Sequence, residues 1–233
     1  MKSEIDHYKE INDKFAKEQN MTFNPRCELI ERDGESHVYL EGGVFDDEDG
    51  ISAKKVRSLL KGDVTVHLNS PGGSTFEGLA IYNALKDHPG HVTVQIDGIA
   101  ASAASIIAMG ANKITARPSS MMMIHRGWTI AIGNAEELRK TADKLVKVDE
   151  ASDKAYLSRF NGRPEELEQM LDDATYLTAD DAYAVGLIDE ILDKEEPVQE
   201  LEEEPIEEPK KTLFDNFKAS VEGVNFYSKF RRN

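Results

Sequence analysis

The chain has 233 residues, a formal net charge of −16 and one cysteine, Cys27. A single cysteine excludes a disulfide framework and a zinc site of the CxxC type. The acidic balance argues against nucleic acid or an anionic membrane as a partner, because both are polyanions. No apolar run reaches the roughly 18 residues that span a bilayer, and the charged N-terminus does not look like a signal peptide. We therefore expect a cytoplasmic protein.

Composition divides the chain into three parts. Residues 1–25 form a polar extension, and residues 26–193 carry the hydrophobic patterning and nearly all the glycines. Residues 194–233 begin with an acidic, proline-containing stretch, which is typical of a disordered linker or a solvated tail. The last residues have apolar side chains at helical spacing, which fits either a frayed tail or a docking peptide.

The middle part of the chain alternates strand and helix patterns. A strand is predicted at 37–40 and a capped helix at 52–60, followed by a strand at 64–68 and a helix at 75–86. A strand at 91–96 and a helix at 101–109 follow, then short strands at 113–116 and 121–124. The longest helix is predicted at 135–160, with a capping box at its start, followed by a helix at 178–185 and a strand at 187–191. This alternation predicts an α/β fold with mainly parallel strands.

A proline and two glycines follow the predicted strand at 64–68. The segment reads Asn-Ser-Pro-Gly-Gly-Ser and ends at Ser74. Glycines allow backbone conformations that other residues avoid, so such a loop can present N–H groups to an oxyanion or to an extended peptide. An ordinary turn between a strand and a helix would have the same composition.

Two further segments place a serine and a histidine after neighbouring strands. Ser102 lies in a run of alanine and serine that opens a helix, where free N–H groups and the helix dipole favour a nucleophile. His125 ends the short strand at 121–124. Taken singly, the serine is more typical of a helix cap or tight packing, and the histidine of a structural residue. Together they supply the parts for acyl transfer by an activated serine.

The motifs NSPGG, GIAASAAS and MMIH, in this order, resemble the ClpP family of serine peptidases. The longer segments DGIAASAAS, SSMMMIH and TYLTADDAYAVGLIDEI are most similar to those of the ClpP-related head maturation proteases of tailed phages and prophages. The resemblance covers roughly residues 34–192. It implies the ClpP/crotonase-type fold, in which repeated ββα units carry a protruding handle helix, here the segment 135–160.

The same resemblance assigns roles to individual residues. Ser102 matches the nucleophile and His125 the general base. The N–H groups of Gly72 and Ala103 match the oxyanion donors. No cofactor and no metal is implied.

The loop after Gly72 has an implied role as well. By resemblance, Gly73 and Ser74 pair with the extended backbone of a polypeptide substrate.

The third member of the triad is where this sequence departs from the family pattern. The family acid falls on Ala174, which cannot orient an imidazole. Asp172 is the first candidate to replace it, because residues two apart in an extended backbone point the same way. Asp173 is the alternative, and a dyad assisted by a backbone carbonyl or a water is a third arrangement. The two aspartates also fit a solvated turn at the end of a helix.

The resemblance further implies a homo-oligomeric ring, a heptamer or stacked rings, with apolar handle residues partly buried between subunits. The expected function is a serine endopeptidase of phage prohead or capsid maturation. It would act in the cytoplasm of a bacterial or phage-infected cell, or inside an assembling prohead. Capsid or scaffold proteins are the expected partners. The alternatives are a Clp-type proteolytic subunit that works with an AAA+ ATPase, a crotonase-like acyl-CoA enzyme, and a non-catalytic ring scaffold.

Overall fold

Alternating burial along the central strands explains why this chain forms a sheet with one covered face. The structure, a computed structural model, describes residues 25–192. In β3 (Val64–Ser70) every second residue is buried, and β4 (Val92–Ala101) begins with the same alternation. The predicted N-terminal extension, acidic linker and C-terminal tail helix lie outside the described residues.

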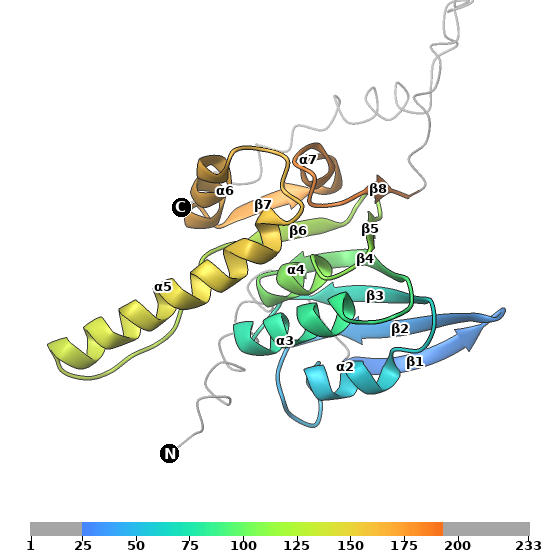
Figure 1. The fold of residues 1–233 in the computed structure, drawn as a ribbon, viewed down its shortest axis with the longest axis horizontal. Helices are drawn as coiled ribbons and strands as arrows, with labels where there is room; N and C mark the ends of the chain where they lie inside the picture. The colour runs from blue at the N-terminus through green and yellow to red at the C-terminus, as the bar shows by residue number, and fades with distance from the viewer. Residues whose placement is uncertain (1–24, 193–233) are drawn as a thin grey trace, which may run out of the picture. The chain divides into compact units, whose positions relative to one another are not determined.

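The main sheet has the order β1-β2-β3-β4-β5-β8 (Figure 1). Its pairs are parallel from β2 to β8, whereas β1 and β2 form an antiparallel hairpin. The predicted α/β class is therefore confirmed. The other strands are β1 (Arg26–Arg32), β2 (Glu35–Glu41), β5 (Lys113–Ala116), β6 (Met121–Ile124), β7 (Thr175–Thr178) and β8 (Glu190–Ile191).

Strand β4 changes its partner half-way along. Its first half pairs with β5, and its second half pairs with β6, which in turn pairs antiparallel with β7. The register between β3 and β4 shifts between Leu68 and Ser70. The side chain of Asn69 fills this irregularity, because its Oδ1 accepts a hydrogen bond of 3.1 Å from the N–H of Ile99. The asparagine of the NSPGG motif therefore locks together the ends of two neighbouring strands.

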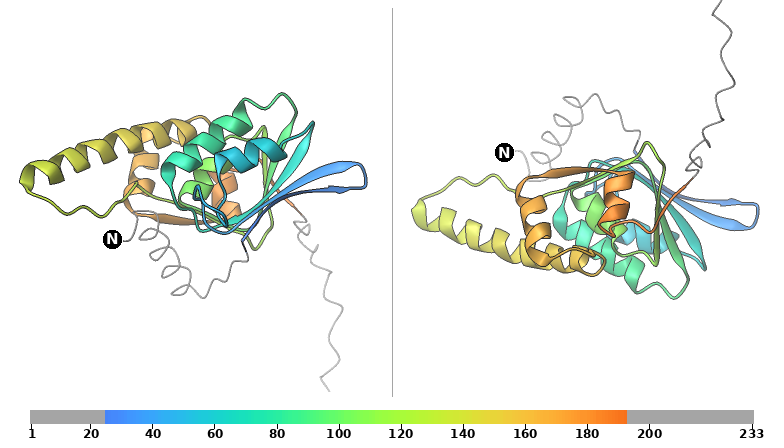
Figure 2. Two further views of the ribbon diagram at one scale, coloured as in Figure 1. Left: turned by 90° about the horizontal axis from the view of Figure 1, so that it is seen from below. Right: turned by 90° about the horizontal axis from the view of Figure 1, so that it is seen from above.

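Three short helices follow β2, β3 and β4 and cover the buried face of these strands (Figures 1 and 2). They are α2 (Ala53–Leu59), α3 (Thr75–Lys86) and α4 (Ala103–Ala108). Ser52 and Ser74 cap the first two, as their side chains accept bonds from backbone N–H groups in the first turn. Gly78 lets α3 approach α4 closely, because a Cβ there would lie 3.0 Å from the carbonyl oxygen of Ala103.

The long helix α5 (Ala135–Leu157) projects beyond the other elements, and its C-terminal end packs against α3 and α4 (Figures 1 and 2). Its buried residues are Ser152, Ala155 and Tyr156, all in the last two turns. The predicted capping box is present at Asn134 and Glu137. The helix has 23 residues. At a rise of about 1.5 Å per residue it is long enough to form the expected handle. Helices α6 (Pro164–Asp172) and α7 (Ala179–Ala184) complete the described chain.

Three elements were not predicted, namely β1, β7 and α6. The predicted end of β4 at residue 96 was also too early, because the strand continues to Ala101. Asp97 and Gly98 both fit the sheet: Asp97 accepts from His67, and Gly98 lies against the side chain of Asn69. The continuation matters, since it is this part of β4 that pairs with β6.

Candidate active site

Ser102 occupies a strained backbone position between β4 and α4. Its φ of 55° and ψ of −125° are unusual for a residue with a side chain. Its N–H donates to the carbonyl of Met123 at 2.9 Å, and its carbonyl accepts from both the N–H and the hydroxyl of Ser105, at 3.0 and 2.6 Å. Such strain persists only where surrounding contacts determine the conformation, which is typical of a functional position.

The strained turn directs the Ser102 hydroxyl to the imidazole of His125. Ser102 Oγ lies 2.7 Å from His125 Nε2, although the two residues come from different crossovers. A hydroxyl donates to Nε2 when the imidazole is neutral and carries its proton on Nδ1. Burial lowers the pKa of His125, and the charge of Asp149 works against that shift. The base is therefore neutral at neutral pH, as proton abstraction requires.

Gly72 packs directly against the serine. Its φ is 91°, and a Cβ at this position would lie 2.7 Å from Ser102 Cβ and 2.9 Å from the nitrogen of Ala103. Ala103 is the first residue of α4, where an N–H has no acceptor within the helix. The N–H of Gly72 donates to the buried hydroxyl of Ser70 at 3.1 Å, so an oxyanion would have to share or replace this bond.

The next two residues of the loop differ in what they can offer a substrate. Val44 pairs with Gly73 in a parallel bridge that uses the carbonyl of Gly72 and the N–H of Ser74. Ser74 also caps α3 with its side chain. The N–H and carbonyl of Gly73 take no part in either bond, because successive groups of an extended backbone point to opposite sides. Gly73 is therefore better placed than Ser74 to pair with an extended peptide.

A hollow beside the serine and histidine adjoins a larger cavity of about 550 Å³. The two share lining residues, and the larger one is mostly apolar with a single lysine, Lys144, among the residues of α5. Sequence patterns did not indicate the aromatic lining, because Phe45 and Trp128 come from loops without periodicity and Phe76 from the exposed first turn of α3. The lining aromatic and aliphatic side chains are Phe45, Phe76, Trp128, Leu145 and Val148.

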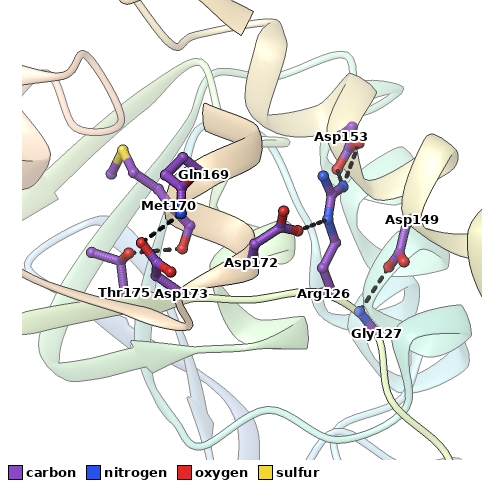
Figure 3. A network of polar contacts seen from close by, with 9 residues as sticks. All are labelled: Arg126, Gly127, Asp149, Asp153, Gln169, Met170, Asp172, Asp173 and Thr175. Atoms are coloured by element: carbon purple, nitrogen blue, oxygen red, sulfur yellow. Dashed lines mark hydrogen bonds and ion pairs between the residues drawn. The ribbon is translucent and has the colours of Figure 1, made fainter. Parts of the chain in front are cut away.

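The acidic candidates of the sequence lie in other contacts (Figure 3). Asp172 accepts from the guanidinium of Arg126 at 2.9 Å, and Asp173 accepts from Gln169. Within residues 25–192, no hydrogen bond or ion pair joins either carboxylate to His125. Ala174 is exposed in the turn between α6 and β7. The structure thus brings Ser102 and His125 together but leaves the expected acid elsewhere, because the end of α6 directs Asp172 toward Arg126.

Arg126 links this turn to the handle helix. Its guanidinium binds both oxygens of Asp153 on α5, at 2.9 and 2.7 Å, as well as Asp172. These carboxylates raise the pKa of Arg126 although burial lowers it, so the group stays charged. In the part of the chain that the structure describes, no cluster of His, Cys, Asp or Glu side chains is arranged to hold a metal ion.

A family model described as Clp protease matches residues 56–195, which is more than half of the chain and includes every site residue named above except Phe45 and Val44. This chain belongs to the Clp protease family. Among curated relatives, the ATP-dependent Clp protease proteolytic subunit 6, chloroplastic, of Arabidopsis thaliana is 33% identical over 138 residues. The match covers 58% of this chain and 51% of the relative, so the chain spans about half the length of that protein. The predicted ClpP membership is confirmed, and the closer likeness to phage proteases stays a prediction.

Proposed function

We propose that this Clp family chain is a serine endopeptidase that hydrolyses peptide bonds through an acyl-enzyme. The observation that carries the proposal is the 2.7 Å contact between Ser102 Oγ and His125 Nε2 at a strained turn, beside the N–H of Ala103. A serine that only capped a helix would use its hydroxyl on the backbone, and Ser102 makes no such bond with its side chain.

The chemistry follows from this geometry. His125 takes the proton of Ser102 as Oγ attacks the scissile carbonyl, and the N–H of Ala103, with that of Gly72, stabilises the oxyanion. The imidazolium then protonates the leaving amine, and the C–N bond breaks to leave an ester on Ser102. Water, deprotonated by His125, attacks this ester, and its collapse returns the proton to Oγ and releases the carboxylate product.

The decisive test is Ser102→Ala compared with the wild-type protein. We expect peptidase activity to fall to background, together with labelling by a fluorophosphonate probe, which bonds to an activated serine hydroxyl. Ser105→Ala is the matched comparison, because Ser105 lies in the same run but its hydroxyl donates to the Ser102 carbonyl and does not face His125; its labelling should be slowed but not abolished. Undiminished activity in the Ser102→Ala protein would show that the nucleophile is assigned wrongly.

The finer assignment rests on the sequence motifs. We propose maturation of a phage prohead or capsid in the cytoplasm of an infected host cell, by a homo-oligomeric ring that acts on capsid or scaffold polypeptides. None of the helices within residues 25–192 is long and apolar enough to cross a membrane. Sedimentation should show an oligomer at micromolar concentration; a monomer would argue against the ring.

The second candidate is a proteolytic subunit that cooperates with an AAA+ ATPase, and the printed name of the Arabidopsis relative favours it. The two proposals differ in their need for ATP. Degradation of a folded protein that appears only with a partner ATPase and ATP would support the second. A crotonase-like acyl-CoA enzyme is disfavoured, because the group that faces His125 is a serine hydroxyl and not a carboxylate.

A further inference from the structure

His125 requires a group that the predicted acids do not supply. When Nε2 accepts the proton of Ser102, the imidazole becomes a cation in a half-buried position, and a nearby negative charge stabilises this form. Asp172 and Asp173 are held by Arg126 and Gln169. Ala174 carries no charge, so a stabilising carboxylate has to come from another element packed around the base.

Asp149 on the handle helix reaches the backbone next to the base. Its Oδ1 accepts a hydrogen bond of 2.7 Å from the N–H of Gly127, which follows His125 by two residues (Figure 3). A Cβ added to Gly127 would lie 3.2 Å from the same oxygen. Side-chain atoms of Val148 and Leu145, also on α5, would lie within contact distance of that Cβ. The carboxylate is half-buried, so α5 holds it firmly against the segment that carries the base.

Of the carboxylates near His125, that of Asp149 is the one whose negative charge is not compensated by an arginine. Asp153 and Asp172 both pair with Arg126, whose positive charge compensates them. Among the described residues Asp149 makes no ion pair with a lysine or arginine, and its hydrogen bond to the N–H of Gly127 engages only Oδ1. An uncompensated carboxylate in a partly buried setting is screened less than one at the surface. Consistent with this, Asp149 is the charge that counters the lowering of the His125 pKa by burial.

We propose that Asp149 is the positioning residue of His125, and that its carboxylate stabilises the imidazolium in place of the acid that the family pattern puts at position 174. The inference rests on the proposed function, since it concerns the base of that same reaction. It moves the third member of the triad from the turn before β7 to the handle helix, within the same subunit.

The test is the pH dependence of kcat/KM for a fluorogenic peptide, measured for Asp149→Asn and for the control Asp172→Asn. Asparagine keeps an acceptor for the Gly127 N–H but removes the charge. The imidazolium then loses stabilisation, so the pKa of His125 falls, the acid limb moves to lower pH, and the plateau falls by up to about tenfold for each pH unit of that shift. The charged groups that face this region are Arg126, Asp153 and Asp172, together with Lys144, which lines the adjoining cavity.

Asp172→Asn should leave the acid limb in place, because Asp172 is largely exposed and Asp153 still pairs with Arg126. A purely structural role of Asp149, or a loss of ring assembly, would lower activity without moving the limb. Sedimentation of both variants separates assembly from chemistry. If Asp149→Asn does not fold, an NMR titration of His125 in Asp149→Ser, which keeps a hydroxyl acceptor, provides the same readout.

The inference is overturned if the limb stays fixed in Asp149→Asn, or if it moves in Asp172→Asn or Asp173→Asn instead. Failure of the proposed function itself has a different signature. In that case wild-type Ser102 would not react with a fluorophosphonate, and no variant of Asp149 would matter.

Discussion

Three residues with side chains have a positive φ, namely Asp33, Ser102 and Ala174, and of these only Ser102 lies at the candidate site. Ser102 has a φ of 55° and Ala174 a φ of 51°. Ser102 is fixed by hydrogen bonds to Met123 and Ser105 and by the packing of Gly72. Ala174 is exposed and makes a single turn bond, from its N–H to the carbonyl of Leu171.

The difference shows how backbone strain relates to function. Strain of this kind costs on the order of 1–3 kcal/mol and persists where neighbouring contacts enforce it. At Ser102 several buried contacts enforce it and direct a hydroxyl to a base. At Ala174 a short turn is enough, and the side chain contributes nothing beyond Cβ. The nucleophile therefore depends on many neighbours, whereas position 174 depends on few.

Gly72→Ala should cause the largest loss of activity, because the added Cβ would disrupt the packing that holds Ser102 in place. The new Cβ would lie 2.7 Å from Ser102 Cβ and 2.6 Å from the carbonyl oxygen of Ala101, and it would crowd the N–H of Ala103. Loss of one oxyanion donor costs about 10²–10³ in rate. We expect a fall of that order in kcat/KM for a peptide substrate.

Gly34→Ala is the matched control for this experiment. Gly34 also has a positive φ, of 85°, but a Cβ there would meet no atom within 4 Å. It should lose some stability through backbone strain, measured by thermal unfolding, and keep its kcat/KM. Equal losses of activity in both variants would mean that backbone strain alone, and not the contact with Ser102, explains the effect.

Tyr156→Phe should have a smaller effect, because it removes a more distant support of the same serine. The Tyr156 hydroxyl lies 2.7 Å from Ser105 Oγ, which donates to the Ser102 carbonyl. Burial raises the pKa of Tyr156, so its hydroxyl stays protonated. Loss of one such bond costs about 1 kcal/mol, equivalent to about fivefold in kcat if the whole loss falls on the transition state.

Tyr183→Phe serves as the control, since this tyrosine is exposed on α7. The measurement is kcat and KM together with thermal unfolding. A loss of stability in Tyr156→Phe with kcat unchanged would show that the Tyr156–Ser105 pair supports the core and not the geometry of Ser102.

Much of the fold was predictable because strong local patterns agree with the tertiary structure. The β-branched strand at β3 and the capping box at Asn134 both appear where the sequence placed them. Strands β1 and β7 were missed, because their side chains are mostly exposed or only half-buried. Helix α6 was missed although Pro164 at its start and the buried Leu167 and Leu171, four residues apart, are typical of a helix. The continuation of β4 through Gly98 depends on Asn69 of another strand, which no local pattern reveals.

At the site, the motifs identified the residues that lie at strand ends. The meeting of Ser102 with His125 was expected, and the structure places them in hydrogen-bond contact. The contributions of α5 were not expected. Asp149 and Tyr156 sit on a helix whose sequence pattern indicates only an amphipathic handle, and their contacts to the site depend on how that helix packs.

The smallest effect is expected for a substitution of Ala174, a residue with a positive φ that lies outside the candidate site. Asparagine tolerates a left-handed backbone better than alanine, so Ala174→Asn should stabilise the fold by about 0.5–1 kcal/mol, or roughly 1–4 °C in thermal unfolding. Ala142→Asn is the matched control: the same substitution at an exposed position within α5 should destabilise by about 0.5 kcal/mol through helix propensity. Neither variant should alter kcat/KM. A fall in kcat/KM for Ala174→Asn alone would mean that this turn still shapes the site, and Ser102 and Ala174 would then differ in degree and not in kind.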